Sequence, residues 1–141
     1  MDTVNKGKDF EDKVLQKLED LYHCKFNRYS IKVGNPPKPK SFDLVSEDKT
    51  IVVECKDNTW SKTDEIPSGK LKTILSEVIY LSKLQKNIKK IIALRKYFSE
   101  RRKQTLAKYF VDHYGHLLDD IQVMELDIEE MTLNRIPSNS S

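Results

Sequence analysis

The chain has 141 residues, of which 38% are hydrophobic and 33% charged, a balance that excludes a wholly disordered polymer and suits a single folded domain over residues 1–141. Its apolar runs are too short to cross a bilayer, and residues 1–6 lack the apolar core of a signal peptide, so we expect a cytoplasmic protein without a membrane partner. Cys24 and Cys55 are too few for a disulfide framework or a cysteine-rich zinc site.

The net charge is +3, and its distribution along the chain says more than its total. Residues 83–108 contain ten Lys or Arg and a single acid, Glu100, whereas residues 119–130 are strongly acidic. This asymmetry indicates a surface that faces a polyanion. The plain alternative is a set of solvated helix surfaces.

The first half of the chain predicts one helix and three strands. The helix has apolar residues at the 3.6-residue period of an amphipathic helix, with Asn5 as its expected N-cap. Three prolines exclude a helix or a central strand from the basic connection that follows the first strand. In order, the elements are a helix over 6–22, a strand over 26–33, the connection over 34–40, and a hairpin of strands over 41–45 and 50–57 with a polar turn at 46–49.

The second half predicts helices that alternate with strands. In order, the elements are a loop over 57–66, a helix over 68–85, a buried strand over 90–95, a helix that Ser99 caps and Gly115 ends, a strand over 121–126, a short helix, and a flexible tail over 136–141. Strands that first meander and then alternate with helices predict an α/β fold (α+β mixed). We expect a central mixed sheet of four to five strands flanked by helices.

The hairpin carries the polar residues of greatest chemical interest. Because strand side chains alternate between faces, Glu54 and Lys56 point to the same side. On the neighbouring strand Asp43 is expected to point away from Phe42 and Leu44, and antiparallel pairing can bring it beside Glu54. Glu54 and Lys56 interrupt an otherwise apolar strand, where a purely structural role would favour Val or Ile.

Two neighbouring carboxylates repel each other, which raises the pKa of one of them. A divalent cation removes this conflict, and magnesium prefers oxygen ligands, takes one or two protein carboxylates and keeps waters that can react. A lysine beside them would stabilise the charge that develops on a phosphate during hydrolysis. Asp43, Glu54 and Lys56 therefore predict a magnesium site for phosphodiester hydrolysis, and the plain alternative is an exposed Glu54–Lys56 salt bridge.

Asp43, followed after ten residues by Glu54-Cys55-Lys56, resembles the motif of the PD-(D/E)XK nuclease superfamily, which has the restriction-endonuclease-like fold. The order of elements is similar as well. A leading helix, a meander that ends in the E-x-K strand, a second helix and a further strand match the common core of that superfamily over roughly residues 6–96. The resemblance implies a magnesium-dependent nuclease, and we expect a DNA endonuclease.

The resemblance also implies roles for individual residues. Asp43, Glu54 and the main-chain carbonyl of Cys55 would bind Mg²⁺, for which Mn²⁺ is expected to substitute. Lys56 would position or polarise the attacking water. Glu11, on the leading helix, would hold a metal-bound water or complete a second site.

One position departs from the motif, because Phe42 precedes Asp43 where the superfamily has proline. The long helix often supplies another polar group in this superfamily, for which Glu77 and Tyr80 are the candidates here. The residues do not separate restriction, junction resolution, repair and defence, nor DNA from RNA.

Candidate contacts to nucleic acid are basic, hydroxyl or aromatic residues near the predicted site: Lys38, Lys40, Trp60, Ser68, Lys70, Arg101, Arg102 and Lys103. Residues 101–103 fall in the first turn of the helix expected after Ser99, where free amides and cations together suit a phosphate. A merely solvated turn is the alternative there. Trp60 would stack on a base, although a lone loop tryptophan is more often a packing anchor.

The main expectation is therefore a nuclease with DNA as its partner, and a homodimer would suit double-strand cleavage. Two alternatives remain open. The first is a non-catalytic nucleic-acid-binding domain on the nuclease fold. The second is a structural α/β domain whose partner is a protein.

Overall fold

The computed structural model describes residues 3–60 and 63–137, with side chains from residue 7 onward, and in this part three helices pack on a six-stranded mixed sheet. A small hairpin of β5 and β6 lies apart from the sheet. The elements are α1 (Thr3–Tyr22), β1 (Phe26–Val33), β2 (Lys38–Ser46), β3 (Ile51–Lys56), α2 (Ser68–Ser82), β4 (Lys89–Arg95), β5 (Phe98–Ser99), β6 (Gln104–Thr105), α3 (Leu106–Tyr114), a 3-10 helix (Gly115–Leu117), β7 (Gln122–Asp127) and β8 (Thr132–Arg135). The predicted α/β class is confirmed, with more strands than the four to five expected.

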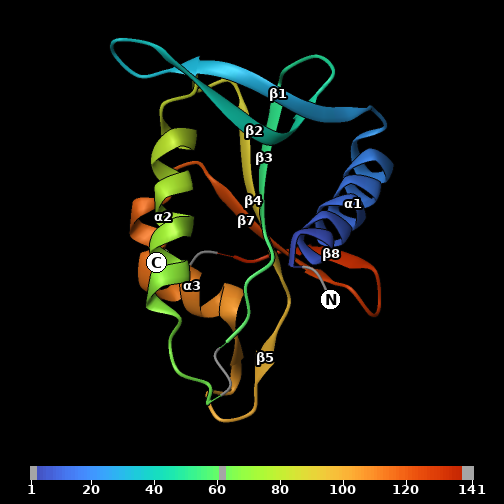
Figure 1. Cartoon of the computed structure of the whole chain (residues 1–141), viewed down its shortest axis with the longest axis vertical. Helices are drawn as coiled ribbons and strands as arrows, with labels where there is room; N and C mark the ends of the chain where they lie inside the picture. The colour runs from blue at the N-terminus through green and yellow to red at the C-terminus, as the bar shows by residue number, and fades with distance from the viewer. Residues whose placement is uncertain (1–2, 61–62, 138–141) are drawn as a thin grey trace.

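The sheet has the strand order β1-β2-β3-β4-β7-β8. The central strand β4 pairs in parallel with β3 and β7, and the outer pairs are antiparallel. Parallel neighbours require a crossover connection, which α2 provides between β3 and β4. Figure 1 shows α1 on one face of the sheet and α2 with α3 on the other.

Each face of the sheet has its own apolar cluster, as the unbroken apolar sequence of β4 requires. Ile91 belongs to the cluster under α1, and its neighbour Ile92 belongs to the cluster under α2 and α3. Typical members of the first cluster are Phe10, Val14, Leu18, Leu44 and Val53, and those of the second are Phe42, Val52, Ile74, Leu81 and Phe110. None of the described helices has the length and apolar character needed to span a lipid bilayer.

A β-bulge interrupts β2 at the predicted catalytic aspartate. The register between β1 and β2 shifts, so that the single residue Arg28 lies opposite both Asp43 and Leu44. Leu44 consequently packs under α1, whereas Phe42 packs under α2. The expectation that Asp43 points away from both Phe42 and Leu44 is wrong, because the extra residue breaks the strict alternation of the strand.

The outer parts of β1 and β2 extend beyond the rest of the sheet. Backbone pairing between β2 and β3 is recorded at Leu44 and Val45, whereas pairing with β1 continues outward to Lys38. We call residues 29–33 and 38–42 the β1–β2 arm, which crosses the top of Figure 1. Strand β2 therefore includes residues 38–40 of the connection that was expected to be irregular. Pro39 fits into this strand because β2 pairs there with β1, beyond its pairing with β3.

Several predicted boundaries are wrong for identifiable reasons. Helix α1 begins at Thr3, so Asn5 lies inside it and is not its N-cap. Ser99 belongs to the β5–β6 hairpin, where its hydroxyl accepts a hydrogen bond from the Arg102 amide at 3.0 Å. Thr105 is the true N-cap of α3 and accepts from the Lys108 amide at 3.1 Å. Both residues bond the amide three positions ahead, so sequence spacing alone does not distinguish them.

The end of the chain also differs from expectation. Helix α2 stops at Ser82, three residues before the predicted end at 85. The predicted terminal short helix is replaced by the edge strand β8. Ile136 packs against the cluster under α2 and α3, so the expected flexible tail does not begin there, and its residues 138–141 lie outside the described part.

Candidate functional site

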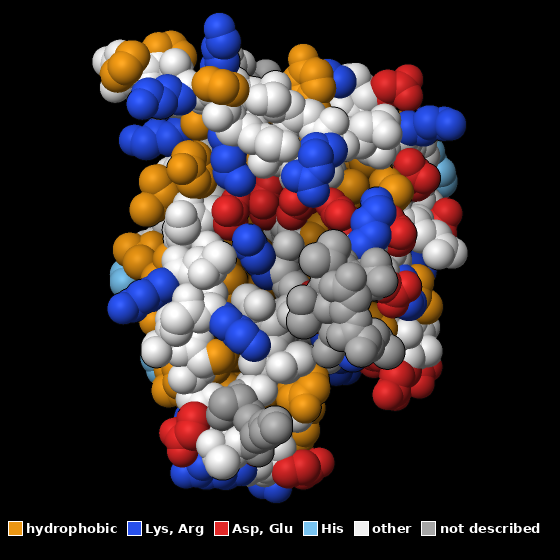
Figure 2. Space-filling model, viewed as in Figure 1, with side chains coloured by type: hydrophobic (Ala, Val, Ile, Leu, Met, Phe, Trp, Pro, Cys, Tyr) orange, Lys and Arg blue, Asp and Glu red, His pale blue; other side chains and the backbone are white. Residues whose placement is uncertain are grey.

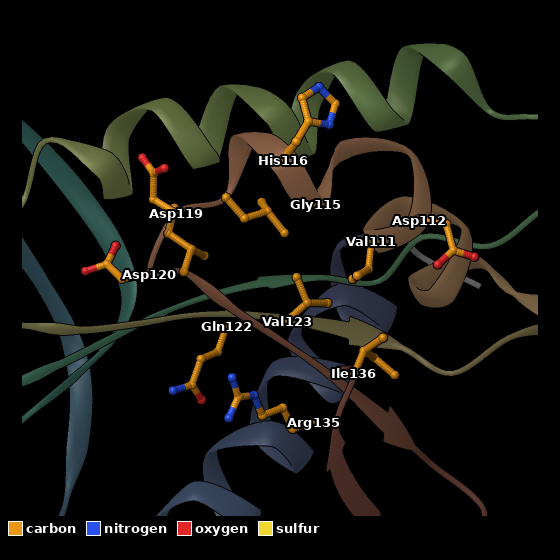
Figure 3. Close-up of a pocket in the computed structure, with 12 residues that line it drawn as sticks. Val111, Asp112, Gly115, His116, Asp119, Asp120, Gln122, Val123, Arg135 and Ile136 are labelled. Atoms are coloured by element: carbon orange, nitrogen blue, oxygen red, sulfur yellow. The ribbon is translucent and has the colours of Figure 1, made fainter. Parts of the chain in front are cut away.

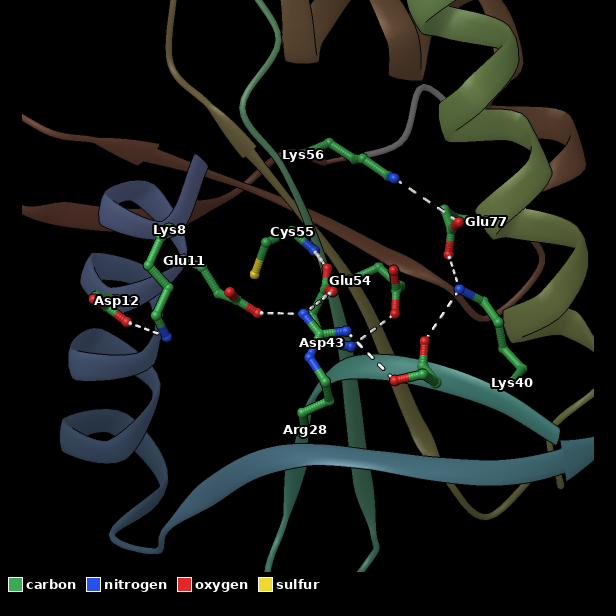
Figure 4. Close-up of polar contacts among 11 residues, drawn as sticks. Lys8, Glu11, Asp12, Arg28, Lys40, Asp43, Glu54, Cys55, Lys56 and Glu77 are labelled. Carbon is green, nitrogen blue, oxygen red and sulfur yellow. Dashed lines mark hydrogen bonds and ion pairs between the residues drawn. The ribbon is translucent and has the colours of Figure 1, made fainter. Parts of the chain in front are cut away.

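Asp43 and Glu54 exchange hydrogen bonds across the gap between β2 and β3. Asp43 Oδ2 accepts from the Cys55 amide at 2.9 Å, and Glu54 Oε1 accepts from the Asp43 amide at 2.9 Å (Figure 4). Both bonds lie just past Leu44 and Val53, a backbone pair of the two strands. The carboxylates thus replace the backbone ladder where the strands separate, and the sequence correctly predicted that Asp43 lies beside Glu54.

Helix α1 brings Glu11 to the same place. Arg28 Nη2 lies 3.2 Å from Asp43 Oδ1 and 3.4 Å from Glu11 Oε1, so one guanidinium bridges the two carboxylates. Burial and the nearby charge of Asp43 raise the pKa of Glu11, and the positive charge of Arg28 compensates this only in part. Glu11 therefore joins the cluster as predicted, through a residue that the sequence did not single out.

Glu54 is the most deeply buried acid of the cluster, with 2% of its surface exposed. Burial raises its pKa to about 9, together with a hydrogen bond to Glu77 and the negative charge of Asp43. Without an added cation, its surroundings therefore favour the protonated form of Glu54. A divalent cation beside it would favour the ionised form, because positive charge lowers the pKa of a carboxyl group.

Glu77 of α2 closes the cluster on the other side. Its Oε2 lies 3.1 Å from Lys40 Nζ and its Oε1 lies 3.8 Å from Lys56 Nζ. Burial raises the pKa of Glu77, but the hydrogen bonds with Glu54 and Lys40 and the charge of Lys56 outweigh it, so the net pKa is lowered. Lys56 thus faces Glu77 and not Glu54. This arrangement differs from the simple Glu54–Lys56 salt bridge considered as the alternative.

Acidic side chains form one band on the surface between α1 and α2. Figure 2 shows acidic side chains in a row across the middle of this face, between α1 and α2, with Lys and Arg side chains above and below. Opposite charges therefore alternate around a strongly acidic centre. Such a surface suits a ligand that combines a cation with anionic groups.

The donors fit a hard divalent cation bound by few protein groups. Within the described residues, no group of three or more His, Cys, Asp or Glu side chains is arranged to hold a metal ion. Magnesium commonly takes one or two carboxylates and completes its shell with water, which Asp43 and Glu54 can satisfy. The raised pKa of Glu54 comes first from its burial and then from the neighbouring Glu77 and Asp43, so a cation at this place would favour its ionised form. The third ligand expected from the family resemblance, the Cys55 carbonyl, stays a prediction.

The structure places Trp60 in the core. It is 3% exposed, its Nε1 donates to the Tyr97 carbonyl at 3.1 Å, and its ring packs against Tyr109 at 5.4 Å between centroids. The guanidinium of Arg102 covers the ring at 5.2 Å. The prediction that Trp60 stacks on a base is therefore wrong, because its ring is already buried as a packing anchor.

The helix start expected at residues 101–103 is wrong, because these residues form the β5–β6 turn and α3 begins only at Leu106, so a contact of these three residues with nucleic acid stays a prediction without helix amides behind it. Arg101 Nη1 donates to the Thr63 carbonyl at 2.9 Å, and Arg102 Nε donates to the Asp64 carbonyl. Both arginines therefore brace the loop after β3. Lys103 is exposed in the turn, and Lys38, Ser68 and Lys70 are exposed as well.

A separate cavity of about 470 Å³ lies on the far half of the sheet (Figure 3). It is bounded by the end of α3, the 3-10 helix and strands β7 and β8. The polar residues that line it are Asp112, His116, Asp119, Asp120, Gln122 and Arg135. Asp120 is already bonded to the buried Lys90 at 3.0 Å, and none of the predicted site residues lines this cavity.

No protein-family model matches the chain, and no curated protein or solved structure matches it. The structure brings together four residues predicted to be catalytic and one helix residue weighed as a candidate, namely Glu11, Asp43, Glu54, Lys56 and Glu77. Arg28 was missed because its position depends on the bulge in β2, for which the sequence carries no clear signal.

Proposed function

We propose that the chain is a magnesium-dependent nuclease that hydrolyses phosphodiester bonds, acting as a DNA endonuclease. The observation that carries the proposal is the reciprocal bonding of Asp43 and Glu54, which fixes two carboxyl groups side by side, next to the Glu77 carboxylate that Lys56 faces. Ionising the buried Glu54 beside Asp43 is electrostatically unfavourable without a cation. Its cost is explained if a cation and a phosphate complete the site.

Each residue of the cluster has its own role in the proposed hydrolysis. Asp43, Glu54 and the Cys55 carbonyl would hold the ion, and a bound magnesium would supply an activated water and polarise the phosphate. Lys56 Nζ lies 3.8 Å from Glu77, which is beyond a good hydrogen bond, so it is free to turn toward a water or a phosphate oxygen. Glu11 lies on the opposite side, where it can accept a hydrogen bond from a water.

A non-catalytic nucleic-acid-binding domain is the second candidate, and one observation favours it. Arg28 contacts Asp43 Oδ1, while Asp43 Oδ2 and Glu54 Oε1 accept backbone amides, so three carboxylate oxygens already have partners. Such a cluster would be stable as a binding surface without chemistry.

Cleavage assays separate the two candidates. Purified protein is incubated with duplex, single-stranded and branched DNA and with RNA, in Mg²⁺, Mn²⁺ or EDTA. We expect cleavage that requires the metal, is strongly reduced in Lys56→Ala, and persists in Lys49→Ala, which changes an exposed lysine of the β2–β3 turn. Salt-dependent binding with no cleavage of any substrate would favour the second candidate. Absence of affinity for every nucleic acid at low salt would contradict both.

A further inference from the structure

We propose that the open face of the β1–β2 arm binds the phosphate backbone of the nucleic acid and guides it to Asp43. The identity of the ligand rests on the proposed function, whereas the choice of this face rests on the burial and charge of the arm itself. The face is defined by Ser30, Lys32, Pro39 and Ser41, and Arg28, next to the arm on β1, continues it at the inner end.

The two faces of the arm differ in what covers them. Residues that are directly paired across an antiparallel ribbon share a face. Val33 is paired with Lys38, and this face packs toward α2, because Val33 and Phe42 are buried and Lys40 contacts Glu77. On the other face, Ser30 is paired with Ser41 and Lys32 with Pro39, and all four residues are exposed. A partner can therefore approach the arm on this second face.

The arm also has the charge expected of a surface that binds a polyanion. Residues 28–42 contain four Lys or Arg and no Asp or Glu, and two of these cations, Arg28 and Lys32, lie on the open side. On the open face, Lys32 lies at the outer end, the hydroxyls of Ser30 and Ser41 lie in the middle, and Arg28 lies at the inner end. Cations and hydroxyls are the side chains that most often contact phosphate and sugar. Side chains two positions apart on a strand are about 6.8 Å apart, so the face presents a regular row of donors.

Arg28 connects this row with the acidic cluster. Its side chain is 58% exposed, and Nη2 makes both carboxylate contacts, to Glu11 and Asp43. Nη1 lies 3.4 Å from the Ser41 hydroxyl, a long contact that a stronger acceptor can replace. Since a guanidinium has five donors, Arg28 can bind a phosphate while it remains beside Asp43. A strand that follows the open face would thus arrive at the carboxylates.

The matched pair Lys32 and Lys38 tests this inference, because both are exposed on the arm but on opposite faces. Affinity of labelled DNA is measured by fluorescence anisotropy in EDTA between about 50 and 200 mM salt, which separates binding from cleavage. We expect Lys32→Ala to weaken binding roughly fivefold and to reduce the salt slope by about one charge. Lys32→Glu should weaken it further, and Lys38→Ala should stay within about twofold of the wild type.

Lys108→Ala provides a second control, since it removes a charge on α3, which packs on β7, and β3 and β4 separate β7 from the arm strand β2. Melting curves check that each variant is folded.

Equal losses of affinity in Lys32→Ala and Lys38→Ala, or wild-type binding by Lys32→Glu, would overturn the inference. If the arm variants bind like the wild type while metal-dependent cleavage persists, the proposed binding role of the arm is contradicted and the proposed nuclease activity is supported. If only open-face variants lose affinity and no substrate is cleaved, the proposed nuclease activity is contradicted and the binding role of the arm is supported.

Discussion

Asp43 and Glu54 each accept a hydrogen bond at 2.9 Å from a backbone amide, and in each case that amide belongs to the other strand. The two side chains therefore hold the point where β2 and β3 part, and the separation of the strands depends on them. A carboxylate fixed in this way cannot turn to solvent without leaving a backbone amide unpaired, which costs about 1–3 kcal/mol. The acidic groups are consequently positioned before any ligand arrives.

The first prediction concerns the pH dependence of stability in EDTA. The pKa of Glu54 is raised from 4.5 to about 9, so between these values the native state holds a proton that the unfolded state has lost. The free energy of unfolding should therefore fall as pH rises through this window, by at most about 1.4 kcal/mol per pH unit from this group. The lowered pKa of Glu77 acts below about pH 4.5 and leaves the window unaffected.

Urea unfolding from pH 5 to 9 measures this effect in the wild type and in Glu54→Gln, which stays neutral and can still accept the Asp43 amide. We expect the variant to gain stability relative to the wild type as pH rises. Glu47→Gln, an exposed change in the β2–β3 turn, is the control. Parallel curves for wild type and Glu54→Gln would show that burial does not raise this pKa.

The second prediction concerns Glu77, whose carboxylate lies between two lysines and is 11% exposed. Glu77→Gln leaves Lys40 and Lys56 without their opposite charge, so we expect a loss of about 1–3 kcal/mol in the free energy of unfolding and slower cleavage. The control is Glu100→Gln, which removes an acid 3.8 Å from Lys103 in a fully solvated pair and should cost under about 1 kcal/mol. Equal effects on stability would argue against a structural role for the Glu77 pairs.

The third prediction concerns Trp60. Trp60→Phe removes the Nε1 bond to the Tyr97 carbonyl and part of a buried ring, and we expect it to destabilise the fold by about 2 kcal/mol or more. Affinity for nucleic acid should be unchanged at a temperature where the variant is folded. Phe98→Leu changes a half-exposed aromatic nearby and should have little effect on stability. A selective loss of affinity in Trp60→Phe would restore the stacking role that burial argues against.

Much of the site was predictable because it lies on regular elements with strong patterns. The helix stripe placed Glu11 at the edge of a buried face, and the alternation of β3 placed Glu54 and Lys56 together. Proximity of Asp43 to Glu54 followed from antiparallel pairing, although the bulge changed the face on which Asp43 lies. Periodicity thus predicts neighbours along an element well.

The errors share one physical cause, which is tertiary context that local patterns do not encode. Ser99 and Thr105 both bond the amide three residues ahead, and only the pairing of β5 with β6 decides which one begins a helix. Trp60 is buried because α3 and Arg102 cover it from distant parts of the chain. Arg28 reaches the site because β2 contains one more residue than β1 across the bulge.

Cleavage by Asp43→Asn tests the central claim most directly. The asparagine keeps an oxygen for the Cys55 amide but lacks the negative charge, so the fold should survive, as a melting curve will verify. In saturating Mg²⁺ we expect single-turnover cleavage to fall by at least about 100-fold, while Asp12→Asn, an exposed change on α1, cleaves like the wild type. Cleavage by Asp43→Asn at the wild-type rate would contradict the assignment of this carboxylate cluster as the active site.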